Sequence, residues 1–325
     1  MALKRVLTIL LAFWVLATGA AHAVEGTSTA GPIGGTDLRA AQLPPPGLYA
    51  GSVLFHAEAK KFYDGGGRPV AALRELDLQR RRVGAFLYWV PQVEVLGGSV
   101  GVLGFVSVGE ECGHLFAASS DRCITGAGDP YLELDWTRFF GTVRPSAFAG
   151  AYPIAEGLTL QLGLGLVVPV GKYEPGIAAR QGLVIGNGIW DIAPLAAFTY
   201  VTRPLLFDGT ELSAKAYWNN YLRNSDTRYQ TGDLLDIDFA LTEMIGRLQV
   251  GLAGFYAFQL EDDRLNGAAI PPDGRRARVL NLGGVVAYDM PEYATSAKLK
   301  ALRTDIHENT PRSWGIAFSL VTKLK

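Results

Sequence analysis

The sequence predicts an all-β protein, a single antiparallel transmembrane β-barrel of about 12 strands preceded by a cleaved signal peptide. The first observation is the segment 158–168, LTLQLGLGLVV, in which Leu or Val occupies every second position. This alternation puts the leucines on one face of an extended strand. The second observation is that similar alternating segments recur along most of the chain. The third is an N-terminal export signal, so the combination favours a barrel with lipid outside and water inside.

Length and composition exclude several classes of protein. The chain has 325 residues, of which 49% are hydrophobic and 19% are charged, so it is neither disordered nor a helical membrane protein. The formal net charge is −1, and a nucleic-acid partner would need a basic surface. We therefore expect no nucleic-acid binding.

Residues 1–23 have the three parts of a secretory signal peptide. Lys4 and Arg5 precede the apolar run 6–17, and Ala21-His22-Ala23 provides an A-x-A cleavage site. The apolar run is too short for a transmembrane helix, which needs roughly 20 residues. A buried core helix is the alternative. We expect the mature chain to begin at Val24.

Two further regions follow the signal peptide. Residues 24–46 are rich in Gly, Ala, Thr and Pro and end in three prolines, which predicts a flexible periplasmic linker. Residues 47–325 repeat one unit, an alternating strand followed by a turn or loop, and are expected to form the outer-membrane β-barrel.

The alternation predicts twelve strands in this region. They are expected at 48–62, 79–90, 98–108, from 130 onward, 157–170, 188–202, 210–222, 232–245, 247–260, 276–289, 293–304 and 312–324. The stretch 130–152 could be one bent strand or two strands around Pro145. We favour one, because outer-membrane barrels of this class have even strand numbers. Long connections alternate with mostly short ones, as expected when one rim faces outward and the other faces the periplasm.

The charged residues of these strands decide which face is wet. An Arg or Lys that faces lipid at mid-membrane costs about 2–4 kcal/mol, so we expect these side chains to line the lumen. The candidates are His56, Glu58, Lys60, Arg82, Glu133, Asp135, Asp191, Glu211, Lys215, Asp236, Asp238, Arg247, Lys298 and Lys300. Opposed acidic and basic walls would favour small polar or amphipathic solutes. Two alternatives remain: the charges pair and plug the barrel, or the barrel is soluble with its leucines inside.

The two cysteines, Cys112 and Cys123, lie 11 residues apart in an exported chain. An oxidising compartment favours one disulfide between them, with two free thiols as the alternative. Because only His114 is nearby, they make a poor metal site, and we expect no metal. The glycines at 65–67 lack the lysine and helix of a phosphate-binding loop, so no cofactor is predicted.

A membrane-embedded hydrolase is a further alternative, and the positions of the histidines argue against it. His56 is the one histidine of the mature chain that lies within a predicted strand, and Ser52 on the same face is roughly 13 Å away at about 3.3 Å per residue. That separation is too long for a nucleophile–base hydrogen bond. We expect no catalytic residues and no enzymatic activity.

Five segments resemble a known family in order along the chain. They are LPPPGLYAGSVLFHAEAKKFYD (43–64), GAGDPYLEL (126–134), GLVVPVGKYEPG (165–176), ELSAKAYWNNYLRNSDTRYQTGDLLDIDFAL (211–241) and GLAGFYAFQLEDDR (251–264). The chain resembles, over most of 43–324, the outer-membrane β-barrel transporter family of the phenol-degradation meta pathway. The resemblance implies an outer-membrane barrel with uptake of small aromatic or hydrophobic compounds, and it carries over no catalytic residue.

The expected function is therefore passive uptake of small solutes by an outer-membrane channel or transporter. The alternative is a closed barrel that acts as a binding or structural module without channel activity. Expected partners are outer-membrane lipid and lipopolysaccharide, a small-molecule solute, and the barrel-assembly machinery during insertion. The expected location is the bacterial outer membrane.

Overall fold

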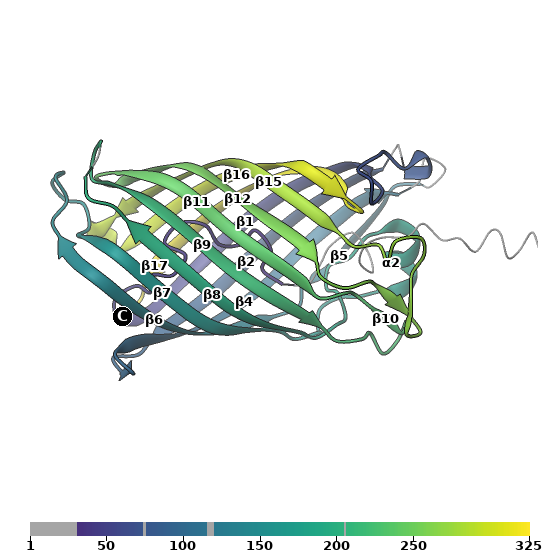
Figure 1. The fold of residues 1–325 in the computed structure, drawn as a ribbon, viewed down its shortest axis with the longest axis horizontal. Helices are drawn as coiled ribbons and strands as arrows, with labels where there is room; N and C mark the ends of the chain where they lie inside the picture. The colour runs from purple at the N-terminus through teal and green to yellow at the C-terminus, as the bar shows by residue number, and fades with distance from the viewer. Residues whose placement is uncertain (1–30, 74–75, 116–119, 205) are drawn as a thin grey trace, which may run out of the picture.

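Twelve long antiparallel strands close into one barrel in the computed structural model, which describes residues 31–325 apart from 74–75, 116–119 and 205 (Figure 1). The strands are β1 (Gly47–Phe62), β2 (Asp77–Val90), β4 (Gly98–His114), β6 (Tyr131–Arg144), β7 (Ile154–Val167), β8 (Asp191–Val201), β9 (Gly209–Tyr221), β11 (Leu234–Ile245), β12 (Leu248–Gln259), β15 (Arg278–Met290), β16 (Thr295–Glu308) and β17 (Pro311–Lys323). Each pairs with the next in this order, and β17 pairs with β1 to close the barrel.

The predicted fold class and strand number are confirmed. The stretch around Pro145 contains one barrel strand, β6, which ends at Arg144 directly before the proline. Proline has no N–H to donate to the ladder, so β6 ends there and residues 145–153 form the turn to β7. The pairing of β6 with β7 begins at Arg144 and Ile154.

The shorter elements lie in the connections. They are β3 (Glu94–Val95), β5 (Arg122–Ala127), β10 (Tyr229–Gln230), β13 (Arg264–Leu265), β14 (Ala268–Ala269), α2 (Pro175–Gln181) and two 3-10 turns, η1 (Ala71–Leu73) and η2 (Pro291–Tyr293). α2, β5 and β10 lie at one end of the barrel, and the C-terminus lies at the other (Figure 1). Among the residues that the structure describes, no helix combines the length and apolar composition needed to cross a membrane.

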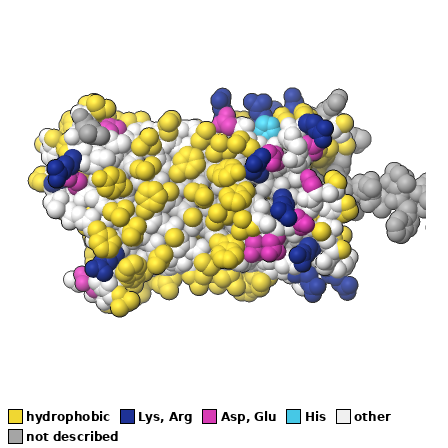
Figure 2. Space-filling model, in the orientation of Figure 1, with side chains coloured by type: hydrophobic (Ala, Val, Ile, Leu, Met, Phe, Trp, Pro, Cys, Tyr) yellow, Lys and Arg dark blue, Asp and Glu magenta, His cyan; other side chains and the backbone are white. Residues whose placement is uncertain are grey.

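Apolar side chains cover the outside of the barrel. Leu162 of β7 is 57% exposed and Leu252 of β12 is 67% exposed, whereas Thr159 and Gln161 on the inner face of β7 are buried. On the face shown in Figure 2, apolar side chains occupy the middle of the barrel and charged side chains lie toward its two ends. An exposed apolar belt of this extent is typical of a surface that contacts lipid.

Apolar residues also fill the barrel end that carries α2. Leu73, Leu115, Ile177, Leu183 and Ile185 belong to one buried cluster, which joins the β1–β2, β4–β5 and β7–β8 connections. The backbone N–H of Val184 donates to Glu111 Oε2 on the inner face of β4, at 3.1 Å. The β7–β8 connection is therefore fastened to the inside of the barrel wall, and the long connections cover this end of the lumen.

Candidate functional site

The lumen is lined by a hydrogen-bonded ionic network between β6 and β9. Lys215 Nζ lies 2.6 Å from Glu133 Oε1 and 3.9 Å from Asp135 Oδ1, and all three side chains are buried. Tyr131 OH donates to Glu133 at 2.6 Å, and Tyr88 OH of β2 donates to Asp135 at 2.7 Å. Alternation along β6 and β9 turns these side chains inward, so the lumen wall is polar and largely charge-paired.

The segment that precedes β1 lies inside the barrel. The N–H groups of Gly34 and Thr36 donate to the carboxylate of Asp238 on β11, at 2.9 and 2.7 Å. Thr36 Oγ1 lies 2.8 Å from Tyr217 OH on β9, and the N–H of Ala41 donates to Thr199 on β8 at 3.0 Å. The segment therefore follows the inner wall, from Gly31 near the α2 end of β9 toward the start of β1.

Charged side chains fasten the same segment. Asp37 Oδ1 lies 2.6 Å from Lys298 Nζ, and its Oδ2 lies 2.8 Å from Lys300 Nζ, both on β16. The guanidinium of Arg39 forms two hydrogen bonds with the carboxylate of Asp289 on β15, at 3.2 and 2.6 Å. Two-point pairing of this kind fixes orientation as well as distance.

This placement differs from the linker that composition predicts for 24–46. The part of that region within the described residues, 31–46, runs through the lumen. The physical reason is that its backbone N–H groups and charged side chains find acceptors and counter-ions on the inner wall, which composition cannot reveal. Residues 24–30 lie outside the described residues.

Ten of the fourteen lumen candidates face inward. They are Arg82, Glu133, Asp135, Asp191, Glu211, Lys215, Asp236, Asp238, Lys298 and Lys300. The network and the inner segment bring most of them together. Arg82, on β2, instead donates to the carbonyl of Val184, at 3.1 Å.

Three candidates on β1 face outward instead. His56 pairs with Ile316, and Glu58 pairs with Trp314, so they share the outer face of β17; Lys60, two residues on, follows the same alternation. β1 has 16 residues, whereas a membrane-spanning strand needs about 9–11. The end of β1 therefore extends past the apolar belt, where an outward charge no longer meets hydrocarbon.

Arg247 lies at the rim rather than in the lumen. It follows the turn between β11 and β12, its Nη1 lies 2.9 Å from Glu292 Oε1, and its Nε donates to the carbonyl of Gly150 at 2.9 Å. The side chain joins three connections at the end opposite α2.

Besides the pairs made by Asp37 and Arg39, the sequence analysis missed an ion pair between β2 and β4. Arg80 Nη2 on β2 lies 2.6 Å from Glu111 Oε1 on β4. Arg80 is two residues from Arg82 and therefore on the same face, so alternation could have identified it. Glu111 falls in a stretch that we expected to be a loop, because β4 is longer than its apolar part.

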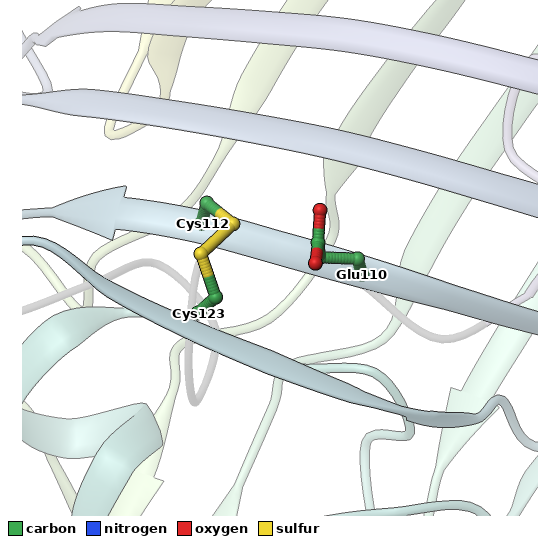
Figure 3. A group of neighbouring side chains, drawn as sticks. All are labelled: Glu110, Cys112 and Cys123. Atoms are coloured by element: carbon green, nitrogen blue, oxygen red, sulfur yellow. A yellow bond between two sulfur atoms is a disulfide. The ribbon is translucent and has the colours of Figure 1, made fainter.

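The predicted disulfide between Cys112 and Cys123 is present and joins directly paired positions of β4 and β5 (Figure 3). Glu110 lies beside it on β4. These three side chains form the one group of potential metal ligands found among the described residues. Because both sulfur atoms are used in the disulfide, a single carboxylate remains, which is too few ligands for a zinc or calcium site.

Comparisons with known proteins agree with this architecture. The family model described as "Putative MetA-pathway of phenol degradation" matches residues 59–320. The COG4313 outer membrane channel from Pseudomonas putida F1 is similar in structure, with a TM-score of 0.70, 16% identity, and coverage of 88% of this chain and 99% of that one. No curated protein matches this chain by sequence.

Two autotransporter structures match less well. The beta domain of Bordetella BrkA gives a TM-score of 0.45 at 12% identity and covers 86% of this chain and 100% of its own. The transport unit of AIDA-I from Escherichia coli gives 0.46 at 8% identity, with 89% and 93% coverage. The fold of this chain is that of an outer-membrane β-barrel, whose outer wall contacts lipid.

Proposed function

Because the chain belongs to the family whose model matches residues 59–320, we propose that it is a non-enzymatic outer-membrane channel for the passive uptake of small solutes. The observation that carries this proposal is the contrast between the two faces of one closed wall. The outer face is apolar, whereas the inner face carries the Lys215–Glu133 network and the Asp37–Lys300 pair. A barrel with a polar interior gives solutes a route that avoids hydrocarbon.

The proposed solutes are small aromatic or hydrophobic compounds. The description of the family, phenol degradation, supports this class. The interior offers apolar surface next to hydrogen-bonding groups, because the buried cluster around Tyr131, Tyr221 and Leu234 adjoins the Glu133 carboxylate. An amphipathic solute needs both kinds of contact, an apolar surface for its ring and a polar group that fixes its orientation.

Residues 31–46 narrow the lumen, so they should limit conduction. In planar bilayers, we expect small single-channel steps from the full chain and larger steps from a variant that lacks residues 31–42. A variant with Glu58→Gln on the outer face serves as the control and should conduct as the full chain does. Folded barrels that stay silent with and without the segment would contradict the channel.

Uptake by cells tests the solute class. A strain that lacks this protein should take up labelled phenol at low external concentration more slowly than the complemented strain. A labelled sugar of similar size provides the comparison. Equal rates of phenol uptake in the two strains would contradict an aromatic substrate.

A second candidate function is a closed barrel that binds or scaffolds without conducting. It is favoured by the inner segment and by the apolar cluster around Leu183 and Ile185, which together occupy the lumen. This candidate predicts silent bilayers for every variant, so the conductance experiment separates the two functions.

We further propose lipopolysaccharide as the lipid partner at the end that carries α2. A groove of about 930 Å³ runs across the outer face there, between the row Leu54, Val83 and Val108 and the more polar row of His56 and Arg81. Apolar side chains suit acyl chains. The exposed guanidinium groups of Arg81, at the groove, and of Arg312 on β17, outside it, suit lipid phosphate. Lipopolysaccharide retained during purification should fall in the Arg81→Gln/Arg312→Gln variant. Insertion by the barrel-assembly machinery stays a prediction.

A further inference from the structure

Among the described residues, two carboxylates on the inner wall have neither a well-aligned hydrogen-bond donor nor an ion-pair partner. Asp191 at the start of β8 and Asp236 on β11 are both 0% exposed, and none of their four oxygens has a hydrogen-bond partner in good geometry among the described residues. The backbone N–H groups of Asn220 and Gly34 lie near Asp191 and Asp236, respectively. Other inward carboxylates are satisfied, for example Asp238 by two backbone N–H groups of the inner segment. Burying an unpaired carboxylate is costly, so within the described part of the chain these two sites lack a closely placed counter-charge.

The side-chain amide oxygen of Asn219 lies beside Gly31, as does the carboxylate of Asp191. Asn219 on β9 is fully buried, and its amide nitrogen donates to the carbonyl of Leu234 at 3.3 Å while its Oδ1 has no partner. Asn219 Oδ1 and Asp191 Oδ2 lie 2.8 and 3.0 Å from the position that a Cβ at Gly31 would take. The two oxygens therefore converge beside the inner segment, at a residue without a side chain.

Gly31 is suited to this position in two ways. Its φ of +99° is a conformation that L side chains rarely adopt, and a Cβ there would press against both oxygens. The segment thus passes over Asp191 and Asn219 without supplying a donor from residue 31. Oxygen atoms from a carboxylate and an amide are ligands that hard cations prefer.

The three lysines of the lumen are already paired elsewhere. Lys298 and Lys300 contact Asp37, and Lys215 contacts Glu133. Their partners hold them away from Asp191, which has no ion pair among the described residues. A small cation from solution is the group that can reach an isolated carboxylate in so confined a space.

We propose that Asp191 and Asn219 bind a small monovalent cation of the size of Na⁺ or K⁺, and that Asp236 adds a second unpaired negative charge along the same wall. The two carboxylates would also make the channel select cations over anions. This selectivity rests on the proposed channel function, whereas cation binding does not.

Binding is tested on the full chain in detergent, without any need for conduction. Thermal unfolding is measured in NaCl, in KCl and in N-methyl-D-glucamine chloride at equal ionic strength, since N-methyl-D-glucamine is too large for the site. A small cation should raise the unfolding midpoint of the wild type by about 2–4 °C, because a ligand that binds only the folded state stabilises it.

Two matched variants test whether the rise in unfolding midpoint depends on Asp191. Asp191→Asn should lose the rise in midpoint in NaCl and KCl, whereas Glu110→Gln, which removes one outer-face carboxylate, should keep it. Asp191→Asn removes an unsatisfied charge, so the barrel should still fold. A wild type that unfolds at the same temperature in all three salts overturns the cation site. An Asp191→Asn variant with the full rise also overturns it.

Selectivity is tested by the reversal potential across a KCl gradient. The wild type should prefer K⁺ over Cl⁻, Asp191→Asn/Asp236→Asn should bring the permeability ratio toward one, and Glu110→Gln should leave it unchanged. An unchanged ratio in the double variant overturns the selectivity. Silent bilayers would refute the proposed channel and its selectivity, while the thermal experiment still decides the cation site.

Discussion

Lys300 Nζ lies 2.8 Å from Asp37 Oδ2, and this contact ties the segment before the first strand to β16, which lies more than 250 residues later in the chain. Lys300 also donates to the carbonyl of Gly34, at 2.6 Å. Both charged side chains are nearly inaccessible to solvent. The contact therefore holds the inner segment in place by a buried charge pair, which is costly to break from one side only.

Asp37→Asn should loosen the inner segment while leaving the barrel closed. The substitution leaves Lys298 and Lys300 without their common counter-ion. A tenfold increase in the population of the detached segment corresponds to a loss of about 1.4 kcal/mol of free energy. We expect the amides of Gly34 and Thr36 to exchange hydrogen at least about tenfold faster, as measured by mass spectrometry. Asp305→Asn on the outer face should leave these rates unchanged, and equal rates in both variants would refute the fastening role.

Lys215→Met should destabilise the barrel by about 3–5 kcal/mol, because it leaves Glu133 and Asp135 buried without a cation. Urea unfolding followed by tryptophan fluorescence measures the change. Lys172→Met is the matched control, since its pair with Glu174 is half-exposed and worth about 0–1 kcal/mol. Similar losses in the two variants would argue against a buried network.

Asp208 should make the barrel sensitive to acid. Burial by itself raises the pKa of Asp208, but hydrogen bonds from Ser146 and from the N–H groups of Ala147 and Gly246, together with Arg144, lower it below its ordinary value of 3.8. A carboxylate with a lowered pKa in the folded state stabilises the fold above its ordinary pKa, and this contribution is lost as the pH falls through the folded-state value.

Asp208→Asn should therefore flatten the fall in unfolding temperature below about pH 4, where the ordinary carboxyl titrates. Its three hydrogen bonds join three turns at the rim opposite α2, so the variant should also be less stable at pH 7, by about 1–3 kcal/mol. Wild type and variant with parallel pH profiles would contradict this assignment.

Lipid contact on the outer face predicts that the cost of an introduced charge depends on its depth in the membrane. Leu162→Lys places a cation in the middle of the apolar belt and should cost about 2–4 kcal/mol, whereas Thr142→Lys, on the outer face near the end of β6, should cost about 0–1 kcal/mol. Folding into lipid vesicles, measured by the gel mobility shift of heat-stable barrels, gives the comparison. Equal costs at the two depths would argue that Leu162 does not face hydrocarbon.

Reducing the disulfide should affect β5 more than the barrel. Cys112 and Cys123 enclose a short loop, for which a cross-link contributes about 2–4 kcal/mol. β4 keeps its partners β2 and β6 without the cross-link. In the Cys112→Ser/Cys123→Ser variant, we expect faster hydrogen exchange over residues 122–127 and an unchanged rate in β6.

Sequence alone could predict most of the residues that line the lumen. It could not predict for every charged side chain whether it faces the lumen or the outside of the barrel. On β8, β9 and β11, the two faces differ so clearly that alternation predicts an inward position for Asp191, Lys215 and Asp236. On β1, His56 has the same parity as the outward Leu54, and the assignment failed there. Membrane depth decides whether an outward charge is costly, and depth is a property of the closed barrel.

The sequence by itself determined the strand pattern, the strand number and the disulfide partners, because a period of two and a short spacing between cysteines are local properties. Only the tertiary structure decided that residues 31–46 lie in the lumen and that Asp191 and Asp236 have no ion-pair partner in the described part of the chain. These facts depend on which backbone and side-chain groups meet across the barrel. Asp37 and Lys300 come together because the wall closes, a constraint that no local pattern contains.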